Sequence, residues 1–101
     1  MSKIEITRTY AYVSADACFV AAKEALARVD FEIWKTRPIG WLVMAHLQTA
    51  EGKINATVAV RPGTGADLTF SLVGETLAED HLRSIAEEAL TFLDDSLVED
   101  P

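Results

Sequence analysis

Four strand-like segments follow one another between residues 31 and 73, and only short turn sequences separate them. The segments are FEIWKT (31–36), WLVMAHLQ (41–48), INATVAVR (54–61) and LTFSLV (68–73). Antiparallel strands can be joined by a tight turn, whereas parallel strands need a crossover connection of a dozen or more residues. The connections here are turn sequences such as RPIG and PGTGAD, which are too short for a crossover. The region therefore predicts a run of antiparallel hairpins.

The segment before these hairpins predicts a fifth strand. Apolar and polar side chains alternate in residues 3–13, as they do in a strand with one buried face. The side expected to be buried carries Ile4, Ile6, Tyr10 and Tyr12. Arg8 falls on this same side, which leaves three interpretations: it extends to solvent at an edge, pairs with a carboxylate, or binds an anionic group of a ligand.

One helix is predicted before the hairpins and one after them. Ser14 is a favourable N-cap for the run ADACFVAAKEALARV (15–29), which has one apolar face. Near the C-terminus, Thr76 and Glu79 have the spacing of a capping box, in which Thr76 accepts from the backbone N–H of Glu79. The sequence behind this box has a wide apolar stripe over roughly twenty residues, which predicts a helix about 30 Å long.

These elements occur in the order β-α-β-β-β-β-α, which predicts a single α+β domain over residues 1–101. We expect an antiparallel, mostly five-stranded sheet with one face covered by the two helices, and a frayed acidic tail at residues 98–101. The other face of the sheet is rich in polar residues, as in antiparallel sheets with one face in water. The polar positions are Thr7, Thr9, Asn55, Thr57, Asp67, Thr69 and Ser71.

Two features depart from this alternation. The stretch GWLVMAHL (40–47) is apolar on both sides of its strand as far as Met44, and its clearly polar side chain is His46. Trp34 falls on the polar side of its own strand, together with Glu32 and Thr36. Apolar residues that gather on an exposed surface often mark an interface.

The order of elements resembles a shortened helix-grip domain of the START and Bet v 1-like superfamily. The resemblance rests on the helix that opens near YVSADACFVAAKEAL, the hairpin meander, and the long C-terminal helix in EDHLRSIAEEALTFLDDSL. It implies a curved sheet and a long helix that enclose an apolar cavity. The order is also similar to that of small uncharacterised bacterial domains with a "G-x-I-x-A" strand and a "G-A-D-L-T" strand, here at residues 52–56 and 65–69.

The charge of the chain excludes several classes of partner. Nine basic and sixteen acidic residues give a net charge of −7, and the basic residues form no cluster in the sequence. Nucleic acids and anionic membrane surfaces require a basic footprint, so neither is an expected partner. The N-terminal sequence MSKIEITRTY lacks the apolar region of a signal peptide, and we expect a cytoplasmic protein. Cys18 is the only cysteine, so no disulfide can form within the chain.

No motif for catalysis, metal binding or cofactor binding is present. RPGTGAD (61–67) lacks the lysine of a phosphate-binding loop and precedes a strand, so it predicts a hairpin turn. His46 and His81 have no second ligand at the spacing that a zinc site needs. Nothing in the sequence argues for an enzyme, and we expect no cofactor.

The first functional hypothesis is a non-catalytic module that self-associates or binds another protein. Its motivation is the concentration of large apolar residues around the strand at 41–48. A homodimer would bury these residues in a contact between identical surfaces. The candidate interface residues are Trp34, Trp41, Leu42, Met44 and His46.

The alternative hypothesis is a carrier or sensor of a small apolar or amphiphilic ligand, as the helix-grip resemblance implies. The ligand would lie between the sheet and the long helix, and Arg8 would meet an anionic head group. The candidate pocket residues are Arg8, Tyr10, Tyr12, Trp41, Met44 and Phe70.

Overall fold

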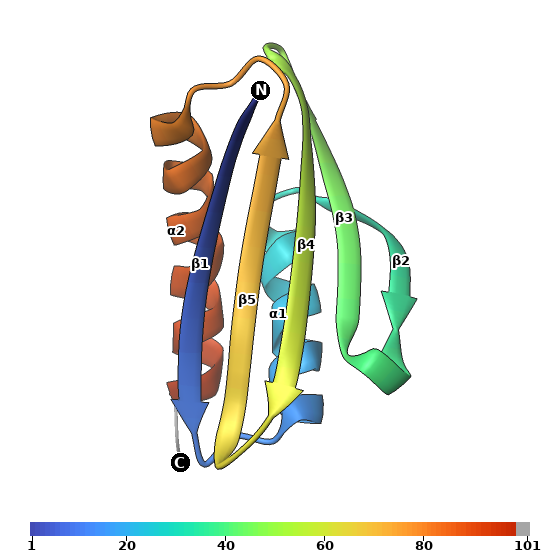
Figure 1. The fold of residues 1–101 in the computed structure, drawn as a ribbon, viewed down its shortest axis with the longest axis vertical. Helices are drawn as coiled ribbons and strands as arrows, with labels where there is room; N and C mark the ends of the chain where they lie inside the picture. The colour runs from blue at the N-terminus through green and yellow to red at the C-terminus, as the bar shows by residue number, and fades with distance from the viewer. Residues whose placement is uncertain (99–101) are drawn as a thin grey trace.

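The computed structural model describes residues 1–98, and its elements follow the predicted order (Figure 1). The elements are β1 (Ser2–Ala11), α1 (Ala15–Arg28), β2 (Glu32–Arg37), a short 3-10 turn η1 (Pro38–Gly40), β3 (Leu42–Thr49), β4 (Gly52–Pro62), β5 (Gly65–Gly74) and α2 (Glu79–Val98). The predicted α+β class and the order β-α-β-β-β-β-α are confirmed. Of the predicted acidic tail, residues 99–101 lie outside the described part of the chain.

The five strands form one antiparallel sheet in the order β1-β5-β4-β3-β2. The three hairpins from β2 to β5 are those that the short connections predict. The first strand, β1, pairs with the last strand, β5, so β1 and β2 are the two edges of the sheet (Figure 1). At Gly65 a Cβ atom would lie 2.2 Å from the carbonyl oxygen of Tyr10, so only glycine fits where β5 begins beside the end of β1.

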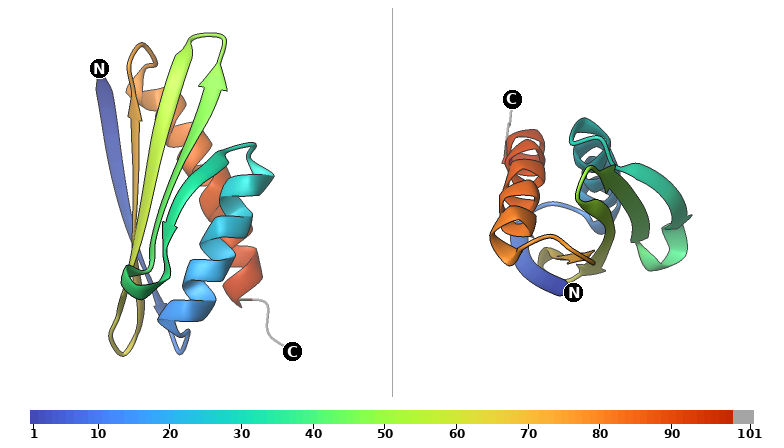
Figure 2. Two further views of the ribbon diagram at one scale, coloured as in Figure 1. Left: turned by 90° about the vertical axis from the view of Figure 1, so that its right-hand side faces the viewer. Right: turned by 90° about the horizontal axis from the view of Figure 1, so that it is seen from above.

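Both helices pack on the same face of the sheet, as the sequence predicts (Figure 2). α2 packs against β1 and β5, while α1 packs mainly against β4 and also contacts β5, β2 and β3. The facing side chains form one continuous buried cluster. Its most buried large members are Leu26, Val43, Ile54, Val58, Leu68, Phe70, Leu72, Leu82, Leu90 and Leu93. None of the helices within residues 1–98 is long and apolar enough to cross a membrane.

The two predicted helix caps have different outcomes. The hydroxyl of Ser14 accepts a hydrogen bond from the backbone N–H of Ala17 at 3.1 Å, so the cap of α1 is confirmed. The predicted capping box of α2 is wrong. The hydroxyl of Thr76 donates instead to the backbone carbonyl of Glu51, in the turn between β3 and β4. The Thr76 hydroxyl, which the local spacing predicts as a cap of α2, therefore forms a contact between two loops instead.

The end of β1 also corrects one expectation. The alternation predicts Tyr12 on the buried face of a strand reaching residue 13, but β1 ends at Ala11. Tyr12 has a φ of 66° and its side chain is 99% exposed, because the chain turns there toward α1. Alternation of residue types cannot reveal where such a turn interrupts a strand.

The uncovered face of the sheet as a candidate interface

The face of the sheet that no helix covers is the candidate functional site, and we call it the open sheet face. The strand register arranges its side chains in three rows that run across all five strands from β2 to β1. The first row is Glu32, His46, Asn55, Val73 and Lys3. The second row is Lys35, Met44, Thr57, Ser71 and Glu5. The third row is Arg37, Leu42, Ala59, Thr69 and Thr7.

Strand β3 divides its apolar residues between the two faces. Val43 and Ala45 are fully buried beneath the helices. Leu42, Met44 and His46 alternate with them on the open sheet face, where they are half-buried. The second apolar side of GWLVMAHL therefore contacts neither α1 nor the core, and it is the most apolar part of the open sheet face.

Trp34 lies at an irregularity in the edge strand β2. The pairing of β2 with β3 shifts between Ile33 and Lys35, so that Trp34 is an extra residue beside Met44. Its side chain is 56% exposed. A bulge in a short, charged edge strand discourages further strand pairing along that edge. Trp34 thus lies at the border of the open sheet face, close to the β3 residues predicted with it.

Trp41 is separated from the other candidate interface residues. It precedes β3 in a left-handed conformation, with a φ of 48°, and packs against the buried core. Its indole N–H donates a 2.6 Å hydrogen bond to Asp16 Oδ1 at the start of α1. Trp41 therefore connects the β2–β3 hairpin to the helix layer, a role that no local pattern indicates.

The candidate pocket residues do not surround a common hollow. Phe70 is buried on the helix side of the sheet, whereas Met44 is on the open sheet face and Tyr12 is exposed at the end of β1. Tyr10 and Arg8 both meet Asp94 of α2, at 2.6 Å through the phenol and 3.9 Å through the guanidinium. Of the three interpretations of Arg8, the structure contains the carboxylate pair. In the described residues, packed side chains occupy the space between the sheet and α2.

Hydrogen bonds and ion pairs hold several polar side chains of the open sheet face across neighbouring strands. His46 Nε2 lies 2.9 Å from Glu32 Oε1, and the hydroxyl of Ser71 donates to Glu5 at 3.4 Å. These contacts fix the side chains in place, and no cluster of metal-binding side chains occurs within residues 1–98. The arrangement is suited to a contact surface.

The sign of the charge differs between the open sheet face and the rest of the chain, a property that the overall charge of −7 conceals. Outward positions of the strands carry five basic and three acidic residues, which leaves four basic and thirteen acidic residues elsewhere in the chain. The basic residues of the open sheet face are Lys3, Lys35, Arg37, Lys53 and Arg61. Counting charge by strand position, rather than along the chain, would have found this asymmetry.

Comparison with solved structures places this architecture among known folds. The chain is similar to the protein TTHA0849 from Thermus thermophilus, with 11% identity and a TM-score of 0.70 over 96% of this chain and 97% of that chain. It is also similar to Ara h 8.0201, a Bet v 1-like allergen, with 8% identity and a TM-score of 0.72 over 98% and 99% of the two chains. The chain has a helix-grip fold.

The helix-grip neighbours include an enzyme as well as an allergen. The ZhuI aromatase/cyclase from Streptomyces sp. R1128 matches with 15% identity and a TM-score of 0.58, over 96% of this chain and 92% of that chain. No protein-family model and no curated protein sequence matches the chain. At these identities the neighbours establish the fold, which supports the predicted helix-grip resemblance, and a fold of this kind is compatible with ligand binding.

Proposed function

We propose that this protein is a non-catalytic, self-associating module, and that two copies dock through their open sheet faces. The observation that carries the proposal is the arrangement of charge at the two edges of the sheet. In the first row Glu32 is at the β2 edge and Lys3 at the β1 edge. In the second row the signs are reversed, with Lys35 at the β2 edge and Glu5 at the β1 edge.

A two-fold axis along β4 makes this pattern self-complementary. β4 is the central strand, so the rotation places the β2 edge of one copy over the β1 edge of the other and keeps each row in place. Glu32 then faces Lys3 of the second copy, and Lys35 faces Glu5. Opposite charges across an interface favour one orientation over others, even where each exposed pair contributes little affinity.

The apolar residues of the open sheet face lie inside this charged border. Met44 and Leu42 of one copy face the hydroxyl-bearing residues Ser71 and Thr69 of the other, while Thr57 and Ala59 of β4 lie near the axis. Five strands spaced by about 4.8 Å and some eight residues long give roughly 500–600 Å² per copy. This area is at the low end for specific complexes, so we expect a weak and reversible dimer.

The alternative carrier function has less support from the geometry. The helix-grip neighbours favour a ligand between the sheet and the long helix, and the candidate pocket residues would have to line that space. Phe70 and Leu90 are within the packed cluster that fills it, and both are almost completely buried. A ligand there would have to displace core side chains.

Sedimentation velocity over about 10–500 µM tests the proposal. We expect the sedimentation coefficient to rise with concentration, and Met44→Glu to abolish the rise because it would bury a charge within the contact. Ser84→Glu adds the same charge on an exposed position of α2 and should leave association unchanged. A wild-type protein that stays monomeric throughout would exclude self-association, and a Met44→Glu variant that associates normally would exclude this face.

A charge exchange tests the orientation separately. Lys35→Glu and Glu5→Lys should each weaken the dimer by roughly fivefold, because each places like charges opposite one another. The double variant restores opposite signs and should return to within about twofold of wild type. If the double variant is as weak as either single variant or weaker, the two-fold axis along β4 is wrong, although the face itself could still be the contact.

A further inference from the structure

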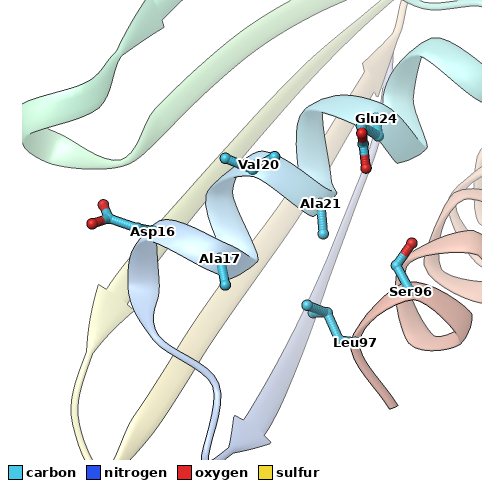
Figure 3. A pocket seen from close by; sticks show the side chains of 7 residues that line it. All are labelled: Asp16, Ala17, Val20, Ala21, Glu24, Ser96 and Leu97. Atoms are coloured by element: carbon cyan, nitrogen blue, oxygen red, sulfur yellow. The ribbon is translucent and has the colours of Figure 1, made fainter. Parts of the chain in front are cut away.

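An apolar groove lies in the helix layer, where the first half of α1 meets the end of α2 (Figure 3). Its volume is about 540 Å³. Figure 3 shows Leu97 of α2 directed toward Ala17 and Ala21 of α1. Val20 also lines the groove, and its side chain is 49% exposed.

The polar residues of the groove are acidic or neutral. Asp16 and Glu24 line it from α1, and Ser96 lines it from α2. No lysine, arginine or histidine is among the seven lining residues. The carboxylate of Asp16 is held in place by the hydrogen bond from the indole of Trp41. The groove thus combines an apolar floor with two carboxylates and lacks a group that would attract an anion.

We infer that this groove binds a cationic amphiphile, with its ammonium group beside Glu24 and its alkyl chain along Val20 and Leu97. An apolar chain would cover the exposed surface of Val20, and the positive head would meet the exposed carboxylate of Glu24. Asp16 lies about two turns away at the other end of the groove and adds to its negative charge. The volume is within the range of small-molecule sites. Anionic amphiphiles such as fatty acids are disfavoured by the same charges.

This inference is independent of the proposed dimer. The groove is formed by α1 and α2, whereas the open sheet face is on the other side of the strands that these helices cover (Figure 2). Ligand binding and self-association can therefore be measured and can fail separately.

The binding experiment uses dodecyltrimethylammonium below its micelle-forming concentration. In the Trp34→Phe protein, Trp41 is the sole tryptophan, and its hydrogen bond to Asp16 makes its fluorescence a reporter of the groove. We expect a saturable change with one ligand per chain, confirmed by calorimetry on the unmodified protein. Tetramethylammonium, which lacks the chain, and dodecanoate, which has the opposite charge, should not saturate over the same concentrations. Saturation by dodecanoate with equal affinity would overturn the assignment.

Matched variants separate this site from general attraction to an acidic protein. Glu24→Gln should weaken binding by roughly three- to fivefold, and Val20→Ser by about fivefold. Glu87→Gln removes one charge from an exposed position of α2 more than two turns from Leu97, and should change the affinity by less than about twofold. Equal weakening by Glu24→Gln and Glu87→Gln, or binding of several ligands without saturation, would show nonspecific attraction and refute the inference.

Discussion

The phenol of Tyr10 donates a 2.6 Å hydrogen bond to Asp94 Oδ1, across 84 residues of sequence. Tyr10 is at the end of the first strand and Asp94 is near the end of the last helix, so one contact connects the two ends of the chain. The ring of Tyr10 is buried against the core while its hydroxyl reaches a half-exposed carboxylate. This is the arrangement in which a tyrosine both fills the core and satisfies its polar end.

Tyr10→Phe should lower the free energy of unfolding by about 1 kcal/mol, because the ring remains buried and only the charged hydrogen bond is lost. Solvent access to Asp94 keeps the loss at this moderate size. Urea denaturation measures it. Thr9→Val removes an exposed hydrogen bond to Asp67 from the same strand and should cost less than about 0.5 kcal/mol. Equal losses in the two variants would contradict the special role of the Tyr10 contact.

Stability should fall in alkaline solution, beginning near pH 9. Burial raises the pKa of the Cys18 thiol from 9.0 to about 11, and burial together with Asp94 raises the pKa of the Tyr10 phenol above its ordinary value. Both groups hold their protons more tightly in the folded state. Their contribution is complete below the unfolded-state pKa and is lost as the pH rises through the folded-state pKa.

The thiol should account for a loss of about 2 kcal/mol between pH 9 and pH 11. Denaturation curves at intervals from pH 8 to pH 11 measure the loss. In Cys18→Ala the free energy of unfolding should fall less steeply between pH 9 and pH 10, whatever the stability of this variant at neutral pH. If the free energy of unfolding falls equally with pH in the wild-type protein and in Cys18→Ala, the thiol does not cause the loss of stability.

Gly65→Ala should destabilise the fold by about 2–3 kcal/mol, since the new methyl group would overlap the backbone of Tyr10. Backbone atoms of a paired strand cannot move aside as a flexible side chain can. Gly40→Ala is a suitable control because nothing lies within 4 Å of the position of its added Cβ. Chemical denaturation should show a change below about 0.5 kcal/mol for the control. Similar stability of the two variants would indicate that β1 and β5 separate at Gly65.

Substitutions along β3 should alternate in their effect on the stability of the monomer. Leu42→Glu places a charge on the open sheet face and should cost less than about 1.5 kcal/mol at concentrations where the protein is monomeric. Val43→Glu would bury an unpaired charge beneath the helices and should prevent folding. Circular dichroism distinguishes these outcomes. A folded Val43→Glu protein would mean that the faces of β3 are assigned incorrectly.

The residues of the candidate interface show which side-chain positions the local sequence pattern predicts and which it does not. Leu42, Met44 and His46 share a face because strand periodicity alone places them there, and the structure agrees. Trp41 has the same apolar character and is next in sequence, yet its left-handed backbone directs it to Asp16. Thr76 has the local spacing of a cap but donates to Glu51. In each exception a partner distant in sequence determines the contact.

The sequence by itself determined the element types, the antiparallel hairpins and the helix-covered face, because period-2 and period-3.6 patterns and short connections are local properties. Only the tertiary structure decided that β1 pairs with β5, since no local signal encodes which strands meet when they are far apart in the chain. That pairing places Lys3 and Glu5 in the same rows as Glu32 and Lys35. It also brings α1, which carries the carboxylates and alanines of the groove, beside the end of α2. The charges of both surfaces are present in the sequence, but their arrangement depends on how the strands and helices assemble.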